Sequence, residues 1–209
     1  MSVKRLVMIM GVQRSGTTAL FSALAAAPGV TGRNEHPNDE IYETYFLRPE
    51  PEVRATLAAL PGTVVLKPVR ESMRRSPQEV AEEYADYDLT IVWSYRDPVN
   101  VYHSWVVKGW VQNHPGFTSV WLRRNRSCLE AREALGDRLV AVRYEDLVSH
   151  PSCCDALAAT LGLAIRPEFR ADSNLGRISL PDDVQSAIDR PTRDTLARLD
   201  AARTIRPAP

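Results

Sequence analysis

The chain has 209 residues, of which 44% are hydrophobic and 25% are charged. These are ordinary values for a folded protein, and the length suits a domain with a substantial apolar core, so disorder, collagen and coiled coil are excluded. Lysine and arginine together number 26, as do aspartate and glutamate, and the net charge is therefore zero. This balance argues against a general nucleic-acid binder that works through bulk positive charge.

Four short apolar runs predict strands. The first begins at Leu6 and is cut short by Gln13 and Arg14, so it indicates a buried strand rather than a signal peptide. The later runs are also rich in Val, Ile or Leu, and none alternates with polar residues, which is typical of strands buried on both faces of a parallel sheet. The predicted strands cover residues 6–10, 64–66, 89–93 and 139–142.

Helix signals lie between these strands. An alanine- and leucine-rich segment over 17–27 predicts a helix, and so does the segment over 152–161. Ser76-Pro77 and Asp97-Pro98 each place a capping residue before a proline, the pattern of a helix start. Strands that alternate with helices predict βαβ crossovers, and hence a three-layer α/β/α fold around a central, mostly parallel sheet.

The chain is expected to form one domain over residues 1–209. Its core would cover about 4–165, and a C-terminal loop and helix over 166–209 would pack on that core. No apolar stretch approaches the roughly 18 residues that a membrane span needs. The three cysteines are odd in number and do not stand at metal-ligand spacing, which predicts a reducing, cytoplasmic setting without disulfides. They are Cys128, Cys153 and Cys154.

The segment between the first strand and the first helix carries the strongest functional signal. Gly11 and Gly16 stand five residues apart there, which predicts a phosphate-binding loop whose backbone N–H groups face an anion at the helix N-terminus. The lysine that a nucleoside-triphosphatase loop requires is replaced by Thr17, and Arg14 supplies a cation three residues earlier. An aspartate that would hold Mg²⁺ is also missing, because the third predicted strand is followed by Arg96.

A second anion-binding pattern follows that third strand. Arg96 stands at the strand end, Asp97-Pro98 begins a helix, and Ser104 lies two turns into it. A guanidinium fork and a serine hydroxyl placed in this way can converge on one oxyanion.

Together, these two segments resemble the sulfotransferases that use 3′-phosphoadenosine 5′-phosphosulfate (PAPS). Residues 13–18 are similar to the family's 5′-phosphosulfate loop, and Arg96 and Ser104 match the arginine and serine that hold the 3′-phosphate, with the same spacing. The resemblance implies a donor site formed by Gln13, Arg14, Ser15, Gly16, Thr17, Thr18, Arg96 and Ser104.

A third segment also matches the family. It reads Val-Arg-Tyr-Glu-Asp-Leu over 142–147 and is followed by Pro151 and by Leu-Gly-Leu over 161–163. We interpret this segment as structural support for the sheet edge rather than as chemistry. The resemblance extends over about 6–163 and is faint in the C-terminal tail.

The resemblance implies a P-loop-like fold and an enzyme that transfers a sulfuryl group from PAPS to a hydroxyl or an amine. The acceptor would be a small molecule or carrier-bound, and the product would be 3′-phosphoadenosine 5′-phosphate (PAP). No metal is expected, because a sulfuryl group needs no bridging Mg²⁺. Nucleic acid and membrane partners are not expected, while homo-oligomerisation is left open. Two alternatives remain: a P-loop kinase-like phosphotransferase and a non-catalytic nucleotide-binding module.

The catalytic base departs from one branch of the family. Lys67 aligns with the lysine of a Lys-Thr-His strand end in the cytosolic sulfotransferases, but Val69 stands where their catalytic histidine would be. Tyrosylprotein, heparan and many bacterial sulfotransferases place a glutamate in the loop after the first helix, which here covers 28–37. Glu35 is therefore the leading base and His36 the competitor, so the chain resembles the glutamate type more closely. The implied catalytic set is Glu35, Arg14, Lys67 and His36.

Three further expectations concern residues outside these motifs. A C-terminal Gly-x-x-Gly-x-x-Lys loop of some family members is absent, and Arg177 in the 174–177 segment is the candidate substitute cation for the donor. Asp39 and Glu40 are interpreted as acids in a first helical turn. Aromatic residues after Glu35 and in the 105–121 segment would line either an acceptor pocket or the core. They are Tyr42, Tyr45, Phe46, Trp105, Trp110, Phe117 and Trp121.

Overall fold

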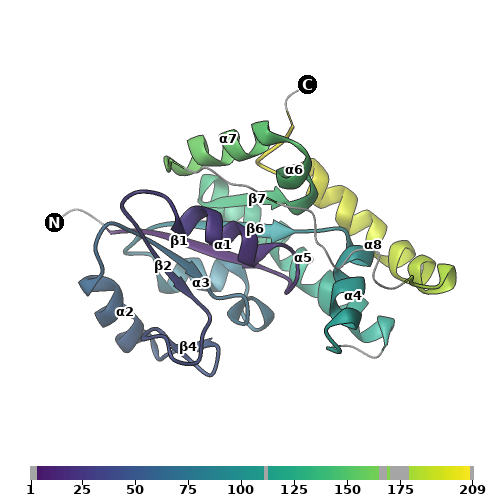
Figure 1. Cartoon of the computed structure of the whole chain (residues 1–209), viewed down its shortest axis with the longest axis horizontal. Helices are drawn as coiled ribbons and strands as arrows, with labels where there is room; N and C mark the ends of the chain where they lie inside the picture. Colours follow the sequence, from purple (N-terminus) through teal and green to yellow (C-terminus); the bar gives the residue numbers. More distant parts are fainter. Residues whose placement is uncertain (1–3, 111–112, 165–168, 170–178, 208–209) are drawn as a thin grey trace.

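A five-stranded sheet forms the centre of this computed structural model, which describes residues 4–110, 113–164, 169 and 179–207 (Figure 1). The strand order is β2-β5-β1-β6-β7, and each neighbouring pair is parallel. The strands are β1 (Arg5–Gly11), β2 (Val30–Asn34), β5 (Thr63–Lys67), β6 (Asp88–Tyr95) and β7 (Leu139–Arg143).

Helices cover both faces of the sheet, which confirms the predicted three-layer α/β fold. Alternate residues of β1 point to opposite faces: Leu6 and Met8 join the apolar cluster of α2, α3, α4, α5 and α8, whereas Val7 and Ile9 join that of α1, α6 and α7. The helices are α1 (Thr17–Ala25), α2 (Glu50–Ala59), α3 (Pro77–Glu83), α4 (Pro98–Val107), α5 (His114–Leu135), α6 (Tyr144–Ser149), α7 (Pro151–Leu161) and α8 (Asp182–Ala202).

The four predicted strands are confirmed as β1, β5, β6 and β7, but the predicted loop over 28–37 is wrong in its first half. That segment contains β2, which pairs only with β5 and is only partly buried, so it shows no apolar run. A short hairpin was also not predicted. It consists of β3 (Tyr42–Glu43) and β4 (Phe46–Leu47), which pair antiparallel.

The caps at two predicted helix starts are confirmed. Ser76 and Glu79 form a reciprocal capping box at α3, and the Asp97 carboxylate accepts the N–H groups of Val99 and Asn100 at α4. The interpretation of Asp39 and Glu40 as helical acids is wrong, since 36–41 is a turn in which Asp39 Oδ1 accepts the Ile41 N–H at 2.9 Å.

The C-terminal helix α8 packs against α4 and α5, on one side of the sheet (Figure 1). Its Asp200 accepts a hydrogen bond from the Tyr95 hydroxyl at 2.9 Å and pairs with Arg143 at 2.9 Å, so it ties the ends of β6 and β7 together. None of the helices among the described residues is both long enough and apolar enough for a membrane crossing. All three cysteines are buried and free.

Candidate active site

The carboxyl ends of all five parallel strands meet at one edge of the sheet, and each brings a residue to the same cavity. Glu35 follows β2, Lys67 ends β5, the 11–18 loop follows β1, Arg96 follows β6 and Tyr144 follows β7. Ligand sites in open parallel sheets lie at this edge. The cavity measures about 320 Å³ and is lined by Gln13, Arg14, Gly16, Thr17, Thr18, Ala19, Glu35, Lys67, Val69, Arg96, Trp110 and Tyr144.

Two glycines let the 11–18 loop pass close to its neighbours. A Cβ at Gly11 would lie 2.2 Å from the carbonyl oxygen of Ser94, and a Cβ at Gly16 would lie 2.0 Å from the Tyr144 ring. Gly16 is also the N-cap of α1, with a φ of 84° that is strained for any other residue. The loop therefore presents the N-terminus of α1 to the cavity, where backbone N–H groups favour an anion.

A buried hydroxyl in the loop lacks a partner. Ser15 is fully buried, and its Oγ has no hydrogen bond to any of the described residues. A buried polar atom without a partner is costly, so the loop carries an unsatisfied hydroxyl directly behind the cavity-lining residues Arg14 and Gly16.

Side chains from β6 and α4 hold the loop from the other side. Arg14 adopts a left-handed φ of 73°, and its Nε donates to Ser104 Oγ at 2.9 Å. Arg96 Nη1 donates to the carbonyl oxygen of Arg14 at 3.3 Å, and Trp105 Nε1 donates to that of Gln13 at 2.9 Å. The two anion-binding patterns found in the sequence are thus parts of one connected site.

Arg96 lines the cavity but is almost completely buried, with only 3% of its surface exposed. Its guanidinium carbon lies 5.1 Å from the Tyr144 ring centroid, and its Nε lies 3.8 Å from Glu145 Oε1. Tyr144 therefore contacts both the phosphate loop and Arg96. The sequence pattern predicts only a structural role for this segment and misses these contacts, although the position of Tyr144 directly after a strand end was an available signal.

Glu35 and Lys67 face the cavity from the neighbouring strands β2 and β5. Lys67 Nζ donates to Thr18 Oγ1 at 3.2 Å, and the backbone N–H of Arg70 donates to the Glu35 carboxylate. Burial raises the pKa of Glu35 above its ordinary value, against the opposing effects of the Arg70 N–H and the Lys67 charge. Burial lowers the pKa of Lys67, and the nearby Arg14 acts in the same direction.

The fold of this chain was compared with those of known proteins. No protein-family model matches the sequence, and no curated protein matches it either. A sulfotransferase from Alicyclobacillus acidocaldarius superposes with a TM-score of 0.68 at 17% identity, over 98% of each chain. The sulfotransferase domain of an olefin synthase from Synechococcus PCC 7002 superposes with a TM-score of 0.61 at 18% identity, over 97% of this chain and 96% of that domain.

The chain has the sulfotransferase fold. A mouse sulfotransferase solved in complex with PAP also superposes, with a TM-score of 0.58 at 12% identity, over 96% of this chain and 89% of that one. The sequence-based resemblance to sulfotransferases is therefore confirmed at the level of the fold.

Three residues predicted from the resemblance lie away from the cavity of this sulfotransferase fold or outside the described residues. His36 is exposed, and its Nδ1 accepts the Asn38 N–H at 3.2 Å, so it serves the turn rather than the cavity. Ser104 is buried behind Arg14. Arg177 lies outside the described residues. Within the described ranges, no group of three or more His, Cys, Asp or Glu side chains is arranged to hold a metal.

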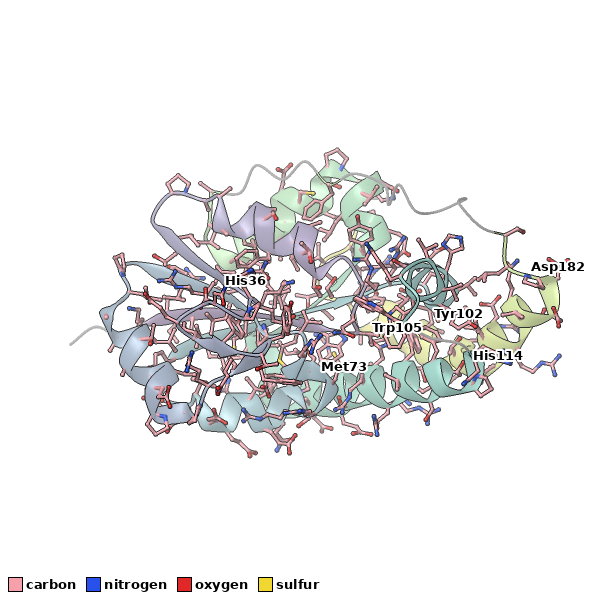
Figure 2. All side chains as sticks on the ribbon, turned by 60° about the horizontal axis from the view of Figure 1, so that its bottom comes forward. His36, Met73, Tyr102, Trp105, His114 and Asp182 are labelled. Carbon is pink, nitrogen blue, oxygen red and sulfur yellow. The ribbon has the colours of Figure 1, made fainter. Side chains whose placement is uncertain are left out.

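A second cavity of about 460 Å³ adjoins the first and shares Gln13 and Trp110 with it. Of the aromatic residues considered from the sequence, Phe46, Trp105 and Trp110 line this cavity. Tyr42, Phe117 and Trp121 belong to the core instead. Figure 2 shows Met73 and Trp105, which both line the second cavity, near the middle of the molecule. The full lining is Gln13, Phe46, Arg70, Met73, Arg74, Trp105 and Trp110.

Proposed function

We propose that the protein is a sulfotransferase that uses PAPS as donor and releases PAP. One observation carries the proposal: three cations, Arg14, Lys67 and Arg96, line the same cavity as the carboxylate of Glu35. The cations suit a donor with several negative charges, and the carboxylate suits an acceptor that must lose a proton. The sulfotransferase fold and the PAP-bound mouse neighbour support this choice of donor.

The chain's residues fit a bisphosphorylated adenosine. The 5′-phosphosulfate would lie at the N-terminus of α1. It would be held there by the N–H groups of the loop, the Ser15 hydroxyl and the side chains of Thr17 and Thr18. Arg96 would hold the 3′-phosphate, and Ser104 on α4 would position Arg14, whose Nε–H its hydroxyl oxygen accepts. The clustered cations and the helix N-terminus that face the cavity are the structural features that support this assignment.

When bound, PAPS supplies an activated sulfuryl group, which passes to the acceptor oxygen while the old S–O bond breaks and its electron pair leaves with PAP. Glu35 takes the proton of the acceptor hydroxyl as the new O–S bond forms. The Lys67 ammonium, the Arg14 guanidinium and the loop N–H groups stabilise the negative charge that collects on the phosphate side. Because this charge-stabilising set is held in place before reaction, it needs little rearrangement during transfer.

Burial raises the pKa of Glu35, which suits the role of a base. A carboxylate whose pKa is raised binds a proton more strongly at neutral pH than an exposed one, which favours proton removal from an alcohol. The exposure of His36 and its bond to the Asn38 N–H favour Glu35 over that competitor. A role for Arg177, the single-domain organisation and a cytoplasmic location remain predictions from the sequence.

Sulfuryl transfer from radiolabelled PAPS to a panel of alcohols, phenols and amines tests the proposal. We expect labelled product from at least one acceptor, in parallel with the release of PAP. Incubation of the same panel with ATP and Mg²⁺ is the control for the kinase-like alternative. Phosphoryl transfer from ATP without any sulfuryl transfer would overturn the proposal, and tight PAP binding without transfer to any acceptor would favour the non-catalytic module.

A further inference from the structure

Two arginines at the second cavity form no close ion pair among the described residues. Arg70 and Arg74 both line this cavity, and neither forms an ion pair with any of the described residues. The next residue provides a contrast, since Arg75 forms an ion pair with Glu83. Of these three neighbouring arginines, Arg70 and Arg74 form no ion pair within the described part of the chain, and both line the second cavity.

Aromatic rings hold these two guanidinium groups in place. The Arg70 guanidinium carbon lies 4.5 Å from the Tyr45 ring centroid, and that of Arg74 lies 3.6 Å from the Phe46 centroid. Cation–π contacts of this kind orient an arginine while they leave its N–H groups free for an oxyanion.

The hairpin that carries these rings is itself held in an unfavourable conformation. Its turn residues Thr44 and Tyr45 have φ values of 49° and 72°, which are rare for side chains other than glycine and for a β-branched residue above all. The buried Glu71 carboxylate accepts the Leu47 N–H at 3.1 Å and fixes the hairpin to the segment between Arg70 and Arg74. Backbone strain of this kind is maintained where the surroundings enforce it, often at ligand sites.

The remainder of the second cavity is mostly apolar. Phe46, Met73, Trp105 and Trp110 supply the apolar lining. Gln13 and Trp110 also line the first cavity, so the two cavities adjoin. The backbone N–H of Arg70 donates to the Glu35 carboxylate, so one residue connects the candidate base to the second cavity. An apolar pocket and two cations thus lie beside the cavity that contains Glu35.

We propose that the acceptor is an amphipathic alcohol or phenol, whose apolar body lies against Met73 and Trp105 and whose carboxylate pairs with Arg70 and Arg74. This inference rests on the proposed sulfotransferase function for its hydroxyl, but the preference for an anion rests on the second cavity alone. The planar, forked guanidinium groups match the geometry of a carboxylate.

A matched pair of ligands tests the preference. The probes are para-hydroxyphenylpropionate and its methyl ester, which differ in charge at one end only. Each is titrated calorimetrically into the protein, both alone and loaded with PAP. We expect the acid to bind about tenfold more tightly than the ester, as a charge-assisted interaction predicts. The double variant with Arg70→Gln and Arg74→Gln should lose this preference, whereas Arg75→Gln should retain it.

The outcomes separate this inference from the proposed function. Equal affinity for the acid and the ester, binding of neither, or a preference that survives the double substitution would overturn the acceptor assignment. Failure of PAP to bind, with the acid preference intact, would overturn the donor assignment and leave the anion pocket standing. PAP binding and thermal unfolding of each variant, measured in parallel, verify that the variants fold.

Discussion

Glu35 and Lys67 occupy neighbouring strand ends, and burial moves their pKa values in opposite directions. Burial disfavours the charged form of each group, so the pKa of the carboxyl rises and the pKa of the ammonium falls. Each charge opposes the shift of the other, since Lys67 favours the carboxylate and Glu35 favours the ammonium. Perturbed pKa values of neighbouring groups in a cavity are typical of functional sites.

Replacing the carboxylate at position 35 tests its role as the base. Glu35→Gln keeps the size of the side chain but removes its ability to accept a proton, so we expect turnover to fall by about 10²–10⁴-fold. PAP affinity should remain close to that of the original protein. Glu40→Gln is the matched control, because Glu40 is an exposed acid that pairs with Arg33 at 3.4 Å. Turnover of Glu35→Gln within threefold of the original would remove Glu35 from this role.

The pH profile of turnover provides a second test at the residue scale. Activity should rise with pH as Glu35 loses its proton, at a pH above the range of an ordinary glutamate. It should fall at higher pH as Lys67 loses its charge, at a pH below the range of an ordinary lysine. Lys67→Arg keeps a permanent positive charge, so initial-rate measurements across pH should show the alkaline fall move to higher pH or disappear. An alkaline limb that stays unchanged would exclude Lys67 as its cause.

Local residue patterns predicted part of this site and missed another part. Arg14 and Lys67 could be found because each stands in a short segment next to a predicted strand. The position of Tyr144 after a predicted strand was a signal, but its contacts with Gly16 and Arg96 form only when three strand ends are brought together. His36 was a candidate base because it is adjacent to Glu35 in the sequence. In the structure, its Nδ1 accepts the Asn38 N–H in the turn instead of facing the cavity.

At the scale of elements, the phosphate loop depends on the helix that follows β7. Gly16 begins α1 with a left-handed φ, and the Tyr144 ring, at the start of α6, occupies the space that a side chain at position 16 would need. The loop and α6 are therefore packed together without a gap, although well over a hundred residues separate them in sequence. This contact gives α6 a place in the donor site in addition to its role at the sheet edge.

Gly16→Ala should disrupt this packing. The added methyl group meets the Tyr144 ring at 2.0 Å and also imposes the strain of a left-handed residue, so we expect PAP affinity to fall by about tenfold or more, ~1.4 kcal/mol. Gly29→Ala is the control, because Gly29 also has a positive φ but no atom lies within 4 Å of its added Cβ. Calorimetry should show unchanged PAP binding in Gly29→Ala, with a loss of stability of about 1–2 kcal/mol. Equal PAP affinity in both variants would contradict the account of the loop.

Two of the elements that the sequence did not predict, β2 and the β3–β4 hairpin, lack a local signature in the chain. β2 lies at the sheet edge, where one neighbour and partial exposure remove the need for an apolar run. The β3–β4 hairpin has two-residue strands and a turn at Thr44-Tyr45, which lacks the glycine or asparagine typical of such turns. The buried strands and the capped helices were predictable, because burial and capping leave local signatures in the chain.

At the scale of the whole molecule, the parallel sheet gathers charge that the composition does not show. The chain has no net charge, yet Arg14, Lys67 and Arg96 converge on one cavity because the strand ends near them point to the same edge. Arg70 and Arg74 extend this positive region to the second cavity. The fold thereby places a cavity rich in cations next to a mostly apolar cavity that carries two further cations.

The central claim is that one site holds both phosphates of a 3′,5′-bisphosphorylated adenosine. The most direct measurement is a calorimetric comparison of PAP with adenosine 5′-monophosphate, which lacks only the 3′-phosphate. The account predicts that PAP binds about 100-fold more tightly, as expected of one or two charge-assisted hydrogen bonds to the 3′-phosphate. Equal affinity for the two nucleotides would contradict it.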